Sequence, residues 1–254
     1  MTENAKHPNN KTLIDAMFKA GSHFAYARSR RHPSAKPFIF GTKNQVEIFD
    51  LEKTAPALES AKDFIKNIVA NGGQVLFLGG KSESRDIVQS AALSVEMPHV
   101  AGRWIGGTFS NFGEIRKRVE KLATLNTKKQ KGELAKYTKK ERVLIDREIA
   151  NLERFFGGLA LMTQLPKVLF LIDHKREAIA VEEAATVGIP VVSLSGSDCN
   201  MKLATHAIPG NDTSVSSIKF VVGEITSAIK EGKALYAKKL ASTPAPVPAQ
   251  PHLA

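Results

Sequence analysis

The stretch Gln74-Val75-Leu76-Phe77-Leu78-Gly79 is an unbroken apolar run with the length of a β-strand. A second run of the same kind is Val168-Leu169-Phe170-Leu171-Ile172. Neither run alternates apolar with polar residues, which is typical of strands that are buried on both faces of a parallel sheet. Each run is followed by a predicted helix and then by another short apolar segment. Two such strand-helix-strand units predict an α/β fold with a parallel sheet and right-handed crossovers.

The other elements of this fold are predicted from periodicity, helix caps and breaks at glycine or proline. Ser82 should cap the helix after the first run, and Gly188 should end the helix after the second. Residues 38–40 and 46–49 should form a hairpin or edge strands. The face that the helix before Gly188 should bury consists of Ala178, Val181, Ala184 and Ala185. The expected helices are 12–21, 52–70, 82–95, 176–187 and 214–230, and the further expected strands are 98–101, 189–194 and 207–208.

The middle of the chain, residues 113–156, has two narrow apolar stripes at helical spacing, separated by a polar connector at 127–136. A narrow stripe leaves most of each helix in water. We therefore predict an antiparallel, coiled-coil-like helical hairpin inserted between the two halves of the α/β domain. The stripes consist of Ile115, Val119 and Leu122, and of Ile145, Ile149, Leu152 and Phe156.

Four parts of the chain are thus predicted, and the net charge of +11 is unevenly divided among them. Residues 1–43 and 113–154 each carry a formal charge of +6, and the remainder is close to neutral. Two separate basic segments are typical of an electrostatic footprint for nucleic acid. The parts are a basic arm with the first helix (1–43), a discontinuous α/β domain (44–112 and 157–231), the hairpin (113–156) and a disordered Pro-rich tail (242–254).

Several function classes are excluded or disfavoured by the sequence. With 43% hydrophobic residues, the chain is too apolar to be disordered throughout, and no apolar run reaches the roughly 20 residues that cross a bilayer. No secretory or transit signal is recognisable, so we expect a cytoplasmic protein. Cys199 is the only cysteine, which excludes an intramolecular disulfide and a multi-thiolate metal site, and the histidines lack metal-ligand spacing. We expect neither a metal nor a cofactor.

Two motifs near the strand ends could carry chemistry. Gly79-Gly80-Lys81-Ser82 follows a strand, but Val75 stands where a phosphate-binding loop requires glycine. Asp173-His174 ends the second strand, where open α/β sheets bind ligands. The simpler interpretation is that Asp173 caps a helix and that His174 faces solvent.

The segment from His23 to Pro33 carries the strongest nucleic-acid signal in the sequence. Arginine and histidine alternate there with aromatic residues, and no carboxylate occurs from Gly21 to Val46. Guanidinium groups bind phosphates in a bidentate manner and aromatic rings stack on unpaired bases, which suits folded RNA. The alternative is that Phe24 and Tyr26 belong to the core.

The segment 102–112, with the sequence GRWIGGTFSNF, resembles the signature R-W-L-G-G-x-L-T-N of the bacterial-type ribosomal small-subunit protein two family, the protein numbered second in that subunit. The resemblance extends from about Leu13 to Glu231. Further matching blocks in the same order are 21–24 (GSHF), 36–41 (KPFIFG), 50–54 (DLEKT), 182–184 (EEA), 188–191 (GIPV), 208–212 (IPGND) and 216–218 (SSI).

This resemblance implies a non-enzymatic ribosomal protein with a Rossmann-like α/β domain and an inserted coiled-coil hairpin. The implied partners are small-subunit rRNA and neighbouring ribosomal proteins, including the large OB-fold protein that binds mRNA, and no membrane or small-molecule substrate is implied. The chain departs from the family at 23–27 (HFAYA) and at 196–201, where the family has an acidic loop. Contacts of the family's residues at these positions, including any bound cation, are therefore not carried over.

We expect the arm and the hairpin to bind rRNA, and the α/β domain to act as a spacer and a platform for protein contacts. The residues expected to contact RNA are His23, Arg28, Arg30, Arg31, Lys36, Arg103, Arg116, Lys117, Arg118 and Lys121. One alternative is an α/β enzyme that acts on a phosphorylated small molecule near Gly79, Gly80 and Asp173. The other is an RNA-binding module that works outside the ribosome.

Overall fold

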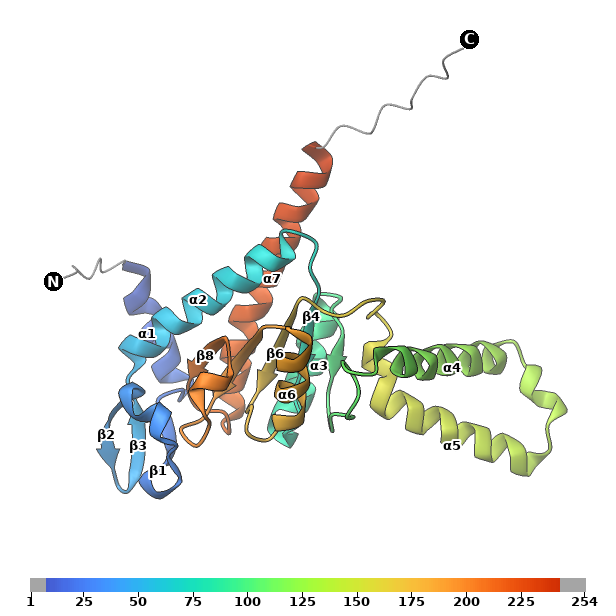
Figure 1. Ribbon diagram of the computed structural model, residues 1–254, viewed down its shortest axis with the longest axis horizontal. Helices are drawn as coiled ribbons and strands as arrows, with labels where there is room; N and C mark the ends of the chain where they lie inside the picture. Colours follow the sequence, from blue (N-terminus) through green and yellow to red (C-terminus); the bar gives the residue numbers. More distant parts are fainter. Residues whose placement is uncertain (1–7, 243–254) are drawn as a thin grey trace, which may run out of the picture.

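The two apolar runs form β4 (Val75–Leu78) and β6 (Val168–Ile172), which pair in parallel at the centre of a sheet. The structure is a computed structural model that describes residues 8–242. β5 (His99–Val100) pairs with the outer side of β4, and β7 (Val191–Ser195) and β8 (His206–Pro209) follow beyond β6. The strand order is therefore β5-β4-β6-β7-β8, with every pair parallel (Figure 1). The α/β fold class predicted from the sequence is confirmed.

Helices cover both faces of this sheet. α2 (Leu51–Val69), α3 (Ser82–Ser94) and α7 (Val215–Ser242) supply apolar side chains to a core on one face. α6 (Ala178–Val187) covers the other face, together with the segment that leads into the hairpin. The result is a three-layer arrangement with the sheet in the middle (Figure 1).

Alternate side chains of the central strands fill the two cores. On the α2, α3 and α7 side, Phe77 and Phe170 are fully buried and meet edge to face with ring centroids 5.5 Å apart. On the α6 side, Leu78 and Leu171 pack in one cluster with Trp104. The lack of alternation in the two runs thus corresponds to burial on both faces, as predicted.

The N-terminal region forms a second, smaller sheet. Its three strands are antiparallel in the order β1-β3-β2, and the hairpin of β2 and β3 was predicted. β1 was not predicted, because its residues were interpreted as an RNA-binding stretch. The elements here are α1 (Pro8–Lys19), β1 (Phe24–Ala27), the 3₁₀ turns η1 (Arg28–Arg30) and η2 (Pro33–Phe38), β2 (Ile39–Lys43) and β3 (Val46–Phe49).

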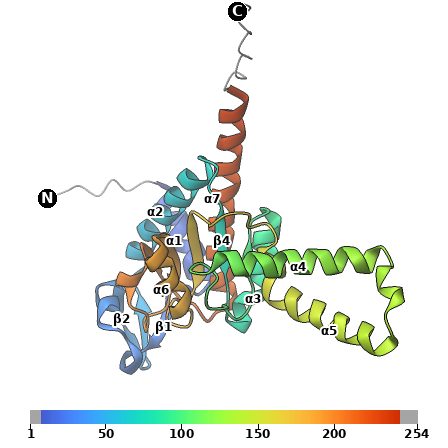
Figure 2. The ribbon, with the colours of Figure 1, turned by 45° about the vertical axis from the view of Figure 1, so that its right-hand side comes forward.

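α4 (Phe112–Gln130) and α5 (Lys139–Phe156) project from the body as a pair and are joined at the far end by a turn that contains η3 (Glu133–Lys136) (Figures 1 and 2). The two helices share a small buried cluster of Leu122, Ile149 and Leu152. Within the predicted first stripe, Ile115 and Val119 instead pack against the core on the α6 side, which anchors the base of α4. That the pair forms a coiled coil stays a prediction.

Two details of the helix predictions were wrong. The residue before α3 that acts as its N-cap is Lys81 rather than Ser82, and its side chain makes no capping hydrogen bond. In α6, Ala178 and Ala185 are exposed and Ala180 is buried instead. The reason is that α6 packs against the core on its side of the sheet through Ala180, Val181 and Ala184.

The terminal helices are longer than predicted. α1 begins at Pro8 rather than at residue 12, and α7 continues to Ser242 rather than ending at Lys230. The remainder of the predicted arm (1–7) and of the predicted tail (243–254) lies outside the described residues. Two further 3₁₀ turns, η4 (Gly157–Leu159) and η5 (Met201–Leu203), complete the described elements.

α7 continues past Lys230 because its next turn packs closely against α2. A Cβ atom at Gly232 would lie 2.8 Å from the carbonyl oxygen of Lys66 and 2.9 Å from Cβ of Val69. A Cβ atom at Gly223, in the same helix, would meet nothing within 4 Å. Gly232 therefore lies in a close contact between α7 and α2, whereas Gly223 has open space beside it.

We predict that Gly232→Ala destabilises the fold by about 1–3 kcal/mol, because the α2 backbone cannot move without disturbing the core. Gly223→Ala should instead stabilise it by up to about 1 kcal/mol, because alanine is the better helix former. Urea unfolding of both variants measures the difference. Changes of the same sign in the two variants would contradict the close contact of α2 and α7.

Candidate nucleic-acid interface

The carboxyl ends of three strands are joined by one buried cation. The ammonium of Lys81, after β4, lies 2.8 Å from the carboxylate of Asp173, after β6, and 2.6 Å from that of Asp212, after β8. All three residues are buried. The strand order reverses between β4 and β6, and this is where open α/β sheets bind their ligands. In this chain that position is filled by the protein's own ion pairs.

The charge state of this cluster follows from its geometry. Burial disfavours the charged form of Lys81, but the two carboxylates outweigh it and raise the pKa of its ammonium. Burial also opposes ionisation of Asp173, yet the hydrogen bond and charge of Lys81 hold the pKa of Asp173 below its ordinary value. For Asp212, the most deeply buried of the three, burial dominates and raises the pKa.

Cys199 lies beside these carboxylates, and ligand atoms of Asp173, Cys199 and Asp212 lie within 4.8 Å of one another. Such a donor set could hold a metal ion, but the Lys81 ammonium already bonds to both carboxylates. The Cys199 thiol donates a hydrogen bond to Asp173, and burial raises its pKa. A thiol in this state is neither a reactive nucleophile nor a ready metal ligand. The residues therefore fit an ammonium group rather than a metal.

The expectation that His174 faces solvent was wrong. Its side chain is 2% exposed, and Nδ1 lies 3.0 Å from the hydroxyl of Ser193 and 2.9 Å from that of Ser195. Burial lowers the pKa of His174. Asp173 does cap the following turn, since its carboxylate accepts hydrogen bonds from the backbone N–H groups of Lys175 and Arg176.

The N-terminal arm packs on these strand ends. The backbone N–H of Tyr26 donates to the Ser197 hydroxyl, and that of His32 donates to the Ser197 carbonyl. Tyr26 is half-buried, and burial, followed by the charge of Asp212, raises its pKa to about 12. The alternative interpretation placed Phe24 and Tyr26 in the core. Tyr26 is half-buried, but Phe24 is 50% exposed and is not a core residue.

The predicted RNA-binding residues of the arm fall into two groups. Arg28 and Lys36 are exposed and have no ion-pair partner among residues 8–242. Arg30 is exposed, lies over the Tyr26 ring and approaches Asp198 at 3.8 Å. Arg31 is different, because it pairs at 2.7 Å with Glu47, which is 1% exposed. Arg31 therefore fastens the arm to β3.

His23 is 9% exposed and lies between two aromatic rings. Its ring centroid is 4.4 Å from that of Phe18 and 4.1 Å from that of Phe24. Burial lowers the pKa of His23, which keeps the imidazole neutral. Phe18 and Phe24 are themselves 61% and 50% exposed. The three rings form an aromatic ledge, defined here as Phe18, His23 and Phe24, on the surface of the arm.

The predicted basic residues of the hairpin are exposed along α4. Lys117 pairs with Glu114 of the same helix, and Lys121 pairs with Glu148 of α5. Arg116 pairs with Glu120 and donates to the Thr163 carbonyl. Arg118 has no ion-pair partner in the described part of the chain. Exposed pairs of this kind are weak and can exchange partners for phosphates.

The arm and the hairpin lie at opposite ends of the α/β body (Figures 1 and 2). Arg103 belongs to neither, since it follows β5 near the base of the hairpin, where it is exposed. Apart from His23, which is buried, and Arg31, which pairs with buried Glu47, the predicted residues therefore form two separate basic surfaces with Arg103 between them.

Glu183 lies in one of the sequence blocks that match the family, 182–184, but no role was predicted for it. Its carboxylate accepts hydrogen bonds from the backbone N–H groups of Gly107 at 2.7 Å and Phe109 at 2.9 Å, and from the indole of Trp104 at 3.4 Å. It thereby fixes the loop that leads into α4. Trp104 is 5% exposed, so its role is packing.

Glu177 is a second residue that sequence analysis missed. Its side chain lies against Gly80, where a Cβ atom would be only 1.8 Å from Oε1 of Glu177. Burial raises the pKa of this carboxyl to about 7; the charge of Arg176 has a smaller lowering effect, and the charge of Asp173 adds to the rise. A buried carboxyl of this kind binds protons near neutral pH.

A family model described as "Ribosomal protein S2" matches residues 17–232 of the chain. This match contains most of the arm, the hairpin and the α/β body as far as residue 232, within α7. Of the helices that the structure describes, none combines the length and apolar character needed to cross a membrane.

Curated relatives agree with this match. A protein of Desulfatibacillum aliphaticivorans named "Small ribosomal subunit protein uS2" is 38% identical over 229 residues, which cover 90% of this chain and 78% of that protein. A protein of the same name from Solidesulfovibrio magneticus is 38% identical over 86% of this chain and 84% of its own length. Another, from Sulfurimonas denitrificans, is 39% identical over 86% and 85%.

We predict that Lys81→Met destabilises the fold by about 3–5 kcal/mol, because two carboxylates lose their buried partner. The control is Lys62→Met, which breaks the partly exposed pair with Glu224 and should cost about 1 kcal/mol or less. Adding Asp173→Asn and Asp212→Asn to Lys81→Met should restore most of the loss. Equal costs for the two lysine variants in urea unfolding would disprove the central role of Lys81.

A second prediction concerns pH. The pKa of Glu177 is higher in the folded protein than in the unfolded chain. The contribution of Glu177 to the free energy of unfolding is therefore highest at low pH, where Glu177 is protonated in both states, and it falls as the pH rises through the unfolded-state pKa toward 7. Glu177→Gln removes this effect, so the stability gain of the variant should grow by about 2.5 kcal/mol between pH 5 and pH 8. Urea unfolding across this range provides the measurement. A gain that does not change with pH would show that Glu177 ionises normally.

Proposed function

The chain belongs to the ribosomal protein S2 family, whose members are structural, non-enzymatic constituents of the small ribosomal subunit, and from this premise we propose that it binds small-subunit rRNA through the arm and the hairpin. The observation that carries this proposal is the division of the basic side chains into two exposed surfaces at opposite ends of a body that is close to neutral. Phosphate contacts from two separated surfaces fix both the position and the orientation of a protein on RNA.

On the arm, Arg28 and Lys36 are the proposed phosphate contacts, since both are exposed and carry charge that no carboxylate of the described residues neutralises. Arg30 stacks on Tyr26, which presents its guanidinium as a rigid plane. The aromatic ledge offers exposed ring faces on which an unpaired base can stack. In this proposal His23 supports the ledge, and Arg31 holds the arm against Glu47.

On the hairpin, Arg118 is the proposed primary contact, and Arg116, Lys117 and Lys121 join it when phosphates replace their exposed glutamate partners. Arg103 extends this surface toward the body. These side chains lie on the exposed faces of α4, because only a narrow stripe of the helix is buried.

The α/β body is proposed to act as a spacer and as a platform for neighbouring ribosomal proteins, with the arm, body and hairpin as its functional parts. The large OB-fold protein that binds mRNA is the partner implied by the resemblance. The ribosome in question is proposed to be that of a bacterial cytoplasm. The enzyme alternative is disfavoured by Lys81, which fills the strand-end position where a substrate would bind.

We predict that the double substitution Arg28→Ala and Lys36→Ala, and separately Arg118→Ala, weaken association of the full chain with small subunits in sucrose gradients. The slope of the logarithm of the binding constant against the logarithm of the salt concentration should become less steep by about 1 for each lost phosphate contact. The control is Lys62→Ala, which removes a positive charge from α2, outside both surfaces. If the control weakens association as much as the test variants do, the two surfaces are not specific contacts.

A further inference from the structure

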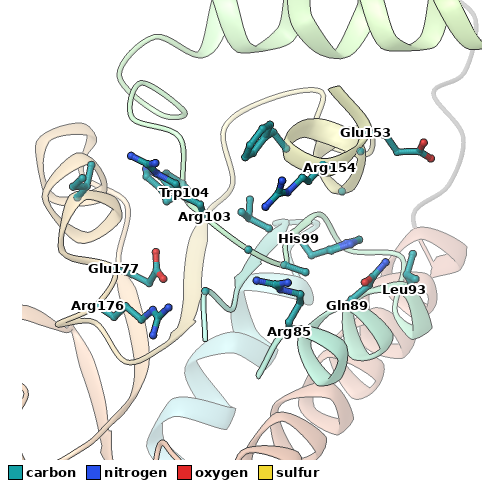
Figure 3. A pocket seen from close by; sticks show the side chains of 18 residues that line it. Arg85, Gln89, Leu93, His99, Arg103, Trp104, Glu153, Arg154, Arg176 and Glu177 are labelled. Atoms are coloured by element: carbon teal, nitrogen blue, oxygen red, sulfur yellow. The ribbon is translucent and has the colours of Figure 1, made fainter. Parts of the chain in front are cut away.

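A pocket of about 770 Å³ lies between the body and the base of the hairpin. It opens at the carboxyl ends of β4 and β5, next to the position that Lys81 fills, and Gly80 forms part of its wall. Figure 3 shows side chains from α3, from the end of α5 and from the segment before α6 around one hollow. Neither the arm nor the proposed phosphate contacts on α4 reach it.

Four arginines from four different segments line this pocket. Arg85 comes from α3, Arg103 from the segment after β5, Arg154 from the end of α5 and Arg176 from the turn before α6. Figure 3 shows Arg85 and Arg176 on one side of the hollow and Arg154 on the opposite side. These residues are far apart in the sequence, so their convergence is a property of the fold.

None of the four guanidinium groups forms an ion pair within the described residues. In the part of the chain from 8 to 242, the arginines that form ion pairs are Arg30, Arg31 and Arg116, and none of these lines the pocket. Arg154 lies 5.4 Å from the Phe155 ring centroid, which leaves its N–H edge free to donate. Four unpaired guanidiniums around one hollow favour an anion that accepts several hydrogen bonds, as phosphate does.

The same pocket also holds groups that accept hydrogen bonds. Glu177 is 6% exposed, and no donor bonds to its side chain within the described residues. His99 is 8% exposed, and its Nδ1 is buried without a hydrogen-bond partner. Leu93 and Ile179, each more than half exposed, provide apolar surface at the pocket. These features match a ligand that has donors and a flat apolar body in addition to its phosphate.

We propose that this pocket binds one nucleotide, with its phosphate among Arg85, Arg103, Arg154 and Arg176 and its base or ribose donors toward Glu177 and His99. A peptide carboxylate fits less well, because its two oxygens offer fewer hydrogen-bond acceptors to the four arginines than the three terminal oxygens of a phosphate do. The nucleotide can be a free molecule or one residue of an RNA strand. If the nucleotide belongs to an RNA strand, the inference rests on the proposed function. If the nucleotide is a free molecule, the inference does not depend on the proposed function.

Trp104, the single tryptophan of the chain, lines the pocket and supplies the readout. The full chain at 150 mM KCl is titrated with AMP, GMP, CMP and UMP, with the four nucleosides, with inorganic phosphate and with tetranucleotide RNAs. We expect a saturable change in Trp104 fluorescence with at least one nucleotide, and at least tenfold weaker binding of its nucleoside. A tetranucleotide that binds at least tenfold more tightly than the mononucleotide identifies RNA as the source, and equal or weaker binding identifies a free nucleotide.

Arg85→Gln and Arg176→Gln should each weaken nucleotide binding about tenfold or more, without loss of fold, because neither side chain forms an ion pair with any residue from 8 to 242. The matched control is Arg118→Gln on the hairpin, which should leave nucleotide affinity unchanged while weakening association with small subunits. The two proposals can therefore fail separately. Equal affinity for nucleoside and nucleotide, no saturable response to any nucleotide or RNA, or equal effects of the three variants would overturn the pocket assignment.

Discussion

The ion pairs of Lys81 with Asp173 and Asp212 are the constraint on which the rest of the structure depends. They join the loops after β4, β6 and β8, which are far apart in the sequence, at one edge of the sheet. Removing three charges from water is costly, and such a cluster persists only when each charge is compensated. The arm packs over the same edge through Tyr26 and the Ser197 loop. The strand ends where other α/β sheets bind their ligands thus hold the arm against the body in this protein.

Much of the fold was predictable because it depends on patterns that are local in sequence. The runs in β4 and β6, the hairpin of β2 and β3 and the two helices of the insertion all have short-range periodic signals. β1 was missed because its aromatic residues were interpreted as part of an RNA-binding stretch, and because its pairing partner β3 is not adjacent in the sequence. The burial of His174 was missed for a similar reason, since its serine partners lie on the neighbouring strand β7.

The positions of the basic residues could be read from the sequence, but which of them form internal ion pairs could not. Arg31 and Arg28 belong to the same basic stretch, yet Arg31 pairs with a buried glutamate, whereas Arg28 is exposed and has no ion-pair partner in the described part of the chain. The difference depends on Glu47, which the fold of β3 brings to Arg31. The arginines around Figure 3's pocket could not be grouped at all, because their four segments meet only after the hairpin docks on the body.

The insertion of the hairpin between β5 and β6 also bears on the order of folding. The central pairing of the sheet joins Val75 to Val168, so the chain must close a long loop before its core can form. Contacts of such long sequence separation slow folding, because their entropy is lost before any core contact compensates for it. α4 and α5 shorten this loop, since their contacts form between residues close in sequence. We therefore expect the hairpin to form first during synthesis and the sheet to close around its base.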